Sequence, residues 1–332
     1  MERALRTALV VATGLLLSGP LVAQDSHVLV VRGIGGNDEY RARFQEWAND
    51  FVTAVTERLG VSQENLLYLS ERHEEDPLAE GPSRREDVEQ AFVNLAANTE
   101  SGDRVAILLI GHGSYTRGES KVNLPGPDIT SAEFGLLLDQ LDGRRILFVN
   151  STESSGGWVE DVSAPGRTVI TATKTGMERN ETVFGGFFVA AFSEDVADVD
   201  KDGQVSALEA FQYAQREVER TYDTTNRIRT EHALLDDNGD GEGTDELGED
   251  VADGAVAATF VLGRAAEAIP ETDDPVLKVL YEERAALEER VAELRTIKDT
   301  LDPEVYETQL ENLLLDLALK NREVRAREGG GA

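Results

Sequence analysis

Two apolar runs of the sequence each end in a polar segment that could do chemistry. The run 105–110 leads into His112, and the run 146–149 leads into Ser151 and Thr152. An imidazole beside a hydroxyl can take its proton and turn it into a nucleophile, as Ser/His pairs do in hydrolases. The two segments therefore predict a site in which His112 faces a hydroxyl that follows the second run.

This pair of segments resembles the caspase/legumain clan of cysteine peptidases, in which a His-Gly ends one buried strand and a Cys followed by small residues ends the next. His112 takes the His position, and Gly113 the position whose backbone N–H stabilises an oxyanion. Laid on the legumain-like Glu-Ala-Cys-Glu-Ser, the segment 150–154 puts Thr152 at the Cys position. The alternative phase puts Glu153 there.

The chain contains no cysteine, and this departure governs the functional prediction. A thiol with a pKa of about 8.5 ionises readily beside an imidazole, whereas the hydroxyl of Thr152 is far less acidic. Over about residues 28–213 we therefore expect a catalytically silent peptidase homologue that binds a peptide or protein segment.

Other interpretations stay open. In an active hydrolase, His112 would work with one of the hydroxyls Ser151, Thr152, Ser154 or Ser155, and the third residue would come from Asp128, Glu153 or Glu178. Alternatively, His112 is a strand-end histidine without chemistry. The resemblance also implies that the segments 171–176 and 178–181 line a substrate pocket. His27, His73 and His232 show no ligand spacing and receive no role.

The most specific motif is an acidic loop at residues 198–209. Its side chains follow the spacing of an EF-hand loop, with Gly203 at the sharp turn and Val205 pointing into the core. The predicted Ca²⁺ ligands are Asp198, Asp200, Asp202, the backbone carbonyl of Gln204, Ser206 and a bidentate Glu209. Carboxylates this close repel one another, so a bound Ca²⁺ would stabilise the loop.

A second stretch, 236–247, begins in the same way with Asp236, Asn238 and Asp240. It departs at Gly243, where an apolar residue is expected, and at Leu247, where a glutamate should close the site. We expect it either to bind Ca²⁺ with ligands from elsewhere or to be a solvated loop.

The elements that would position these residues alternate along the chain. Short apolar runs with few polar interruptions predict buried strands, and stretches with apolar residues at helical spacing separate them. This pattern predicts an α/β fold with a mostly parallel, caspase-like sheet covered by helices on both faces. In such sheets ligands bind beyond the carboxyl ends of the strands, where His112 and Thr152 would both lie.

Composition limits the partners and the compartment. The chain of 332 residues carries 32 basic and 64 acidic side chains, a formal charge of -32, which excludes nucleic acid as a partner. Residues 1–23 have a basic start, a short apolar stretch and a small residue at the expected cleavage site, which together predict a signal peptide. After its removal we expect no stable membrane span. We expect an exported protein, periplasmic or extracellular, in which the domain occupies residues 24–265.

Residues 266–332 form a linker and a C-terminal appendage. Two seams of apolar residues at heptad-like spacing flank Asp302-Pro303. They predict a helical hairpin, which could also join copies of the chain into a homo-oligomer.

Overall fold

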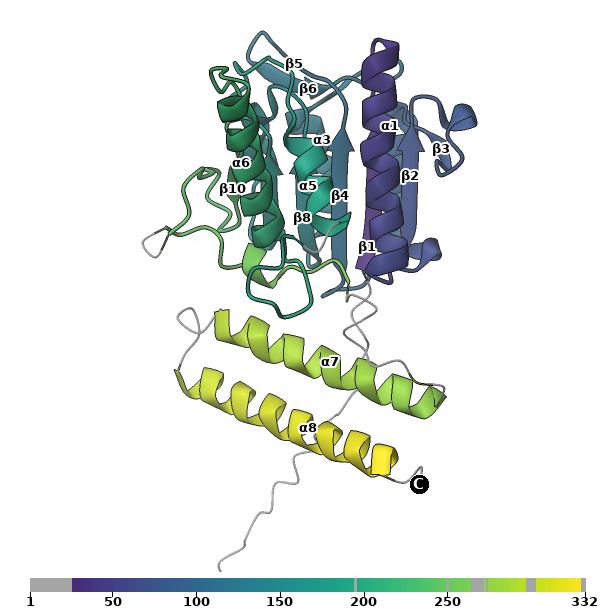
Figure 1. Cartoon of the computed structure of the whole chain (residues 1–332), viewed down its shortest axis with the longest axis vertical. Coiled ribbons are helices and arrows are strands. Elements are labelled where there is room, and N and C mark those ends of the chain that lie inside the picture. Colours follow the sequence, from purple (N-terminus) through teal and green to yellow (C-terminus); the bar gives the residue numbers. More distant parts are fainter. Residues whose placement is uncertain are drawn as a thin grey trace, which may run out of the picture.

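The computed structural model describes residues 26–193, 196–248, 251–263, 272, 274–296 and 303–329. The predicted signal peptide and most of the predicted linker lie outside the described residues. The chain folds into an α/β domain followed by a helical hairpin, so the predicted fold class is confirmed (Figure 1).

The centre of the domain is a seven-stranded sheet in the order β10-β9-β8-β4-β1-β2-β3. All neighbouring strands are parallel except β10, which pairs antiparallel with β9 at one edge. The strands are β1 (Ser26–Arg32), β2 (Leu66–Ser70), β3 (Gly81–Pro82), β4 (Arg104–Ile110), β8 (Arg145–Asn150), β9 (Arg167–Thr171) and β10 (Leu234–Asp236).

Helices cover both faces because the central strands are apolar on both sides. Val28 and Val30 of β1 face one hydrophobic core with α1 (Asp38–Thr53), α5 (Phe184–Ser193) and α6 (Ala207–Thr224). Leu29 and Val31 face a second core with α2 (Arg85–Asn98) and α3 (Ser131–Leu138). Successive side chains of a strand point to opposite faces, so an unbroken apolar run requires cover on both.

Short helical turns complete the connections. Further helical segments are the π-helical continuation Ala54–Arg58, the 3₁₀ turns Gln63–Asn65, His73–Glu75, Asp139–Leu141, Ser155–Trp158 and Ala257–Thr259, and α4 (Val159–Val162). Asn37 is the N-cap of α1, and its side chain accepts a hydrogen bond from the Tyr40 N–H; Thr130 is the N-cap of α3 and forms a capping box with Glu133. These caps satisfy N–H groups that the helix leaves without partners.

A small antiparallel sheet follows β4 and was not predicted. It consists of β5 (Gly113–Thr116), β6 (Glu119–Val122) and β7 (Ile129–Thr130). Its strands are too short and too polar to give a clear sequence signal. Gly113, the first residue of β5, therefore belongs to a strand rather than to a loop.

The hairpin consists of α7 (Pro275–Thr296) and α8 (Pro303–Gly329), which lie side by side beyond the end of the sheet opposite β5 and β6 (Figure 1). The predicted seams meet at Leu287, Val291, Leu294 and Leu313, and again at Tyr281 and Val324. Ion pairs between Lys320 and Glu283 and between Arg327 and Asp274 confirm that the helices are antiparallel. Within the described residues, no helix combines the length and apolar character needed to cross a membrane.

The second core depends on an aromatic cluster around α3. The ring of Phe134 lies 5.3 Å from that of Phe92, 5.1 Å from that of Phe148 and 5.5 Å from that of Trp158. We expect Phe134→Ala to lower the free energy of unfolding by about 3–5 kcal/mol, because it leaves a cavity among rigid rings. Leu136→Ala on the same helix, at a side chain 67% exposed, should change it by less than about 0.5 kcal/mol. Urea denaturation measures both, and equal effects would contradict this assignment of the core.

Candidate functional site

The two predicted polar segments meet at one edge of the sheet. β4 and β8 are parallel neighbours, with Leu109 opposite Asn150, so the segments that follow them leave from the same carboxyl edge. The contact is close: a Cβ added at Gly113 would overlap the carbonyl oxygen of Glu153 and lie 2.5 Å from Thr152 Oγ1. Only glycine fits there, since any larger residue would push the two segments apart.

The residue that faces His112 is Glu153. Its Oε1 lies 2.9 Å from His112 Nδ1, and its Oε2 accepts a hydrogen bond of 2.9 Å from the Gly113 N–H. One carboxylate thus binds both the imidazole and the amide that the resemblance assigns to the oxyanion. Glu153 is the residue that the alternative phase of the sequence comparison puts at the Cys position, and it is Glu153, not Thr152, that contacts His112.

Aromatic rings hold the imidazole from the side of α1. The His112 ring packs edge-on against Tyr40 at 4.7 Å and against Phe44 at 5.1 Å. The hydrogen bond to Glu153 raises the pKa of His112 above its ordinary value, and the charge of Glu153 and a hydrogen bond to the backbone of Gly35 act in the same direction. Desolvation opposes this shift without reversing it.

The predicted hydroxyls do not pair with His112. Thr152 is fully buried, and its Oγ1 donates to Asn150 Oδ1 at 2.8 Å. Ser151 Oγ donates to the Leu109 carbonyl at 2.7 Å. Ser154 and Ser155 are also fully buried, and none of these four hydroxyls is hydrogen-bonded to the ring in the described part of the chain. The expected His112–Thr152 pair is therefore replaced by His112–Glu153, because the turn after β8 directs the hydroxyls inward.

The residues predicted as a third catalytic group, other than Glu153, also lie in contacts that do not involve His112. Asp128 accepts a hydrogen bond from the Leu124 N–H, and within the described residues no hydrogen bond or ion pair joins it to His112. Glu178 contacts a different histidine, with its Oε1 2.7 Å from His232 Nδ1. His232, to which the sequence assigned no role, is thus half of a second histidine–carboxylate pair. The partners are 54 residues apart, a separation that gives no local sequence signal.

A cavity of about 310 Å³ lies beside this second pair. It is bounded by the end of β9, the start of α5 and the middle of α6, and its lining includes Ala172, Phe184, Val218, Glu231, His232 and Asp245. Glu231 is only 1% exposed and accepts hydrogen bonds from the N–H groups of Val183 and Phe184. Burial raises the pKa of Glu231 to about 7.

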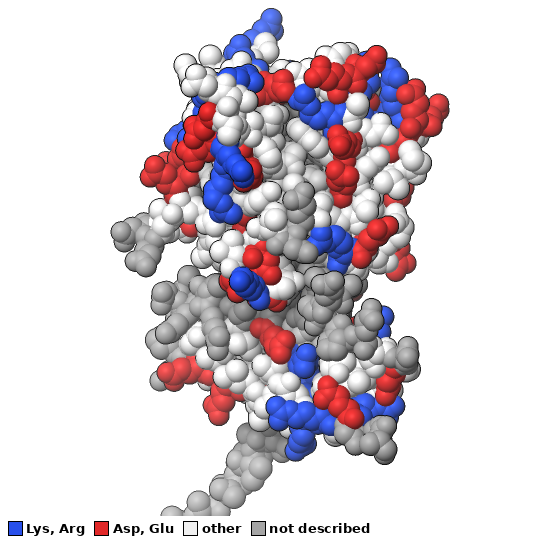
Figure 2. All heavy atoms as spheres, in the orientation of Figure 1, with Lys and Arg blue, Asp and Glu red and all other residues white. Residues whose placement is uncertain are grey.

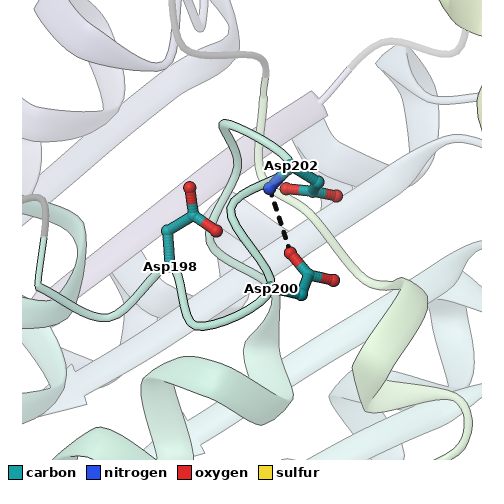
Figure 3. Close-up of side chains that lie close together, drawn as sticks. All are labelled: Asp198, Asp200 and Asp202. Atoms are coloured by element: carbon teal, nitrogen blue, oxygen red, sulfur yellow. Dashed lines mark hydrogen bonds between the residues drawn. The ribbon is translucent and has the colours of Figure 1, made fainter.

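The acidic loop 198–209 connects α5 to α6 at the end of the domain away from the His112 site (Figure 1). Figure 3 shows Asp198, Asp200 and Asp202 gathered around one turn, and one carboxylate oxygen from each lies within 4.8 Å of the other two. Asp198 Oδ2 accepts a hydrogen bond from the Gly203 N–H, Asp200 from Asp202 and Asp202 from Gln204. Asp198 Oδ1 is buried and has no hydrogen-bond partner among the described residues. Burial, and then the neighbouring carboxylates, raise the pKa of Asp202.

The remaining predicted ligands of this loop serve the start of α6. Glu209 Oε2 accepts from Ser206 in a capping box, and its Oε1 accepts from the Val199 N–H at 2.8 Å. Glu209 is thus bound to the backbone of the loop and does not join the group of three aspartates. The Gln204 N–H donates to Asp202, and Ser206 caps α6 with Glu209, so their predicted roles as Ca²⁺ ligands stay predictions.

The second loop repeats the internal hydrogen bonds of the first. Asp236 Oδ2 accepts from the Gly241 N–H, Asn238 Oδ1 from Asp240 and Asp240 Oδ1 from Glu242. In both loops the donors and acceptors occupy the same relative positions. Its twelfth position is Leu247, and the place of Glu209 is taken by Asp253, whose Oδ1 accepts hydrogen bonds from the N–H groups of Asp237 and Asn238.

Acidic and basic side chains intermingle on the face of the molecule drawn in Figure 2, with no continuous basic patch.

No protein-family model matches the chain, and no curated protein does. Among solved structures, the chain is similar to protein GSU0716 from Geobacter sulfurreducens, with a TM-score of 0.43 and 12% identity over 64% of this chain and 92% of that one. It is also similar to Raptor from Chaetomium thermophilum, with a TM-score of 0.36 and 9% identity over 89% of this chain and 35% of that one.

The His112–Glu153 pair predicts a measurable titration. A raised pKa means that the pair stabilises the fold below the ordinary value of 6.5, and this contribution is lost as pH rises through the pKa of the folded state. Glu153→Gln should lower the His112 pKa and reduce stability more at pH 6 than at pH 9. Nuclear magnetic resonance of the imidazole protons measures the pKa. Glu178→Gln, at the second pair, is the matched control and should leave it unchanged. The same His112 pKa in Glu153→Gln would contradict the assignment.

Proposed function

We propose that this chain is an exported, calcium-binding, caspase/legumain-like peptidase homologue that binds a peptide or protein segment at the carboxyl edge of its sheet without hydrolysing it. The observation that carries the proposal is the Glu153 carboxylate, which bridges His112 Nδ1 and the Gly113 N–H. The groups that the resemblance assigns to base and oxyanion binding are already joined by one side chain.

Electrostatics explains why this arrangement disfavours hydrolysis. An oxyanion hole works because its donors are aimed at the place where negative charge develops. Here the Gly113 N–H donates to a carboxylate, which would repel an oxyanion at that place. The hydroxyls of Ser151 and Thr152 are buried and donate to oxygens of the protein. Hydrolysis by either hydroxyl would require both the carboxylate and the turn to move.

The same edge offers features that suit binding. The antiparallel strands β5 and β6 project from it, and the cavity of about 310 Å³ opens beside the Glu178–His232 pair. The turn after β8 touches the segment that carries Glu178, since the Ser154 N–H donates to the Glu178 carbonyl at 2.8 Å. Ligands of α/β sheets bind at this edge, where loops present polar groups beyond the strand ends.

Assembly through the hairpin is a second candidate function. Several apolar side chains of α7 and α8 remain exposed, namely Val276, Val279, Leu314, Leu315 and Leu319. A second copy of the hairpin could cover them in a larger helical bundle. Such assembly is compatible with peptide binding, because the hairpin lies away from the carboxyl edge (Figure 1).

The calcium proposal rests on the three clustered aspartates and on Asp198 Oδ1, which no described residue binds. With a dissociation constant of about 1 mM, typical of extracellular sites, 10 mM Ca²⁺ would stabilise the protein by about 1.4 kcal/mol. Calorimetry should show this as a higher melting temperature. Asp202→Asn should reduce the gain and raise the stability without Ca²⁺, because it removes one repelling charge. Asp223→Asn, an exposed site on α6, is the control. A full Ca²⁺ effect in Asp202→Asn would contradict the site.

The peptide proposal is tested by measuring binding and cleavage together. A panel of fluorogenic peptides, with and without Ca²⁺, should show saturable binding and no turnover. Ser114→Trp on β5 should block binding sterically, whereas Ser101→Trp, before β4 at the opposite edge, should not. Turnover that His112→Ala abolishes would replace the proposal with an active hydrolase, and the absence of any binding would refute it.

A further inference from the structure

The cavity beside Glu178 and His232 has an apolar base and a charged lining. Ala172, Phe184 and Val218 supply apolar surface between β9, α5 and α6. Its volume of about 310 Å³ is at the small end of ligand sites, which span about 300–1,000 Å³. A side chain or a small molecule would fill it.

The charges around the cavity favour a cation. Four carboxyl groups line it, against two guanidinium groups, those of Arg216 and Arg229. Arg229 has an acidic partner, Glu219, at 3.9 Å, and the lining residue Asp245 is paired with Lys174 at 2.9 Å. Arg216 lies at the exposed rim, where water can solvate it.

Glu231 is different from the other acids of the lining because it is buried. It accepts hydrogen bonds from the N–H groups of Val183 and Phe184, and no Lys, Arg or His of the described chain forms an ion pair with it. A carboxylate offers about four acceptor positions, so it can accept a further donor from inside the cavity. Burial without a cation is costly for a carboxylate, and the raised pKa of Glu231 reflects that cost.

We propose that this cavity binds the side chain of a lysine or arginine carried by the peptide ligand, with Glu231 accepting the cationic group and Phe184 and Val218 packing against its methylenes. Long basic side chains bury their apolar stems in this way while the charge finds a polar partner. The peptide as carrier rests on the proposed function. The cavity itself can be tested without it.

The experiment uses capped single amino acids as probes, observed through the backbone amide resonances of Val183 and Phe184 at pH 8. N-acetyl-lysine amide and N-acetyl-arginine amide should bind saturably. N-acetyl-norleucine amide, which keeps the methylenes without the charge, and N-acetyl-glutamate amide should bind at least about tenfold more weakly.

Variants then locate the acceptor. Glu231→Gln should weaken the cationic probes by about tenfold or more, because it removes the buried charge and keeps the shape. Glu246→Gln, an exposed acid of the same lining, is the matched control and should change binding by less than about twofold. Thermal melts establish whether both variants fold. If Glu231→Gln does not fold, the series of four probes on the unchanged protein decides whether the cavity binds a cation.

Each opposite result overturns the inference. Norleucine binding as tightly as lysine would make the cavity simply apolar, preferred binding of glutamate would make it an anion site, and no binding of any probe would remove the site. Binding of lysine that survives Glu231→Gln would also refute the role of Glu231. If the probes bind as expected while no peptide does, the cavity stands as a cation site and the peptide-binding function fails.

Discussion

The carboxylate of Glu153 is the interaction on which the carboxyl edge depends. Parallel pairing of β4 and β8 brings two loops together, and glycine at position 113 lets them approach until the carboxylate reaches both His112 and the backbone. A charged hydrogen bond of this kind is stronger than a neutral one, especially where water is partly excluded. The arrangement therefore favours a closed, preformed edge over an open nucleophilic centre.

The same use of carboxylates recurs through this acidic chain. Glu231 accepts from two N–H groups at the start of α5, Glu209 accepts from the loop that precedes α6, and Asp237 accepts from Gly254 and Ala257. Backbone donors satisfy these anions without basic side chains. Since the chain has twice as many acidic as basic residues, ion pairs alone could not neutralise its carboxylates. Binding to backbone N–H groups lets acidic residues stabilise local structure.

Much of the fold could be predicted because burial leaves a regular trace in the sequence. The apolar runs of β1, β4 and β8 are covered on both faces, and the seams of α7 and α8 meet as their spacing indicates. The site was harder to predict because the turn after β8 has no periodicity. Thr152 and Glu153 differ by one position, and only the backbone of the turn decides which side chain faces His112. The Glu178–His232 pair was missed because its partners are distant in sequence and meet only through the fold.

α6 connects the two ends of the domain at which ligands are proposed. It begins in the acidic loop, where Glu209 and Ser206 form its cap, and its later turns carry Val218 and Tyr222 to the cavity and to Glu231. α6 has 18 residues and packs against α5 and the core. Because the packed interior resists compression, a displacement of one end of α6 would move the whole helix more readily than bend it. An ion in the loop would act on the start of α6, far from the His112 edge. Its effect on a ligand in the cavity would therefore come through the order of this helix rather than through direct coordination.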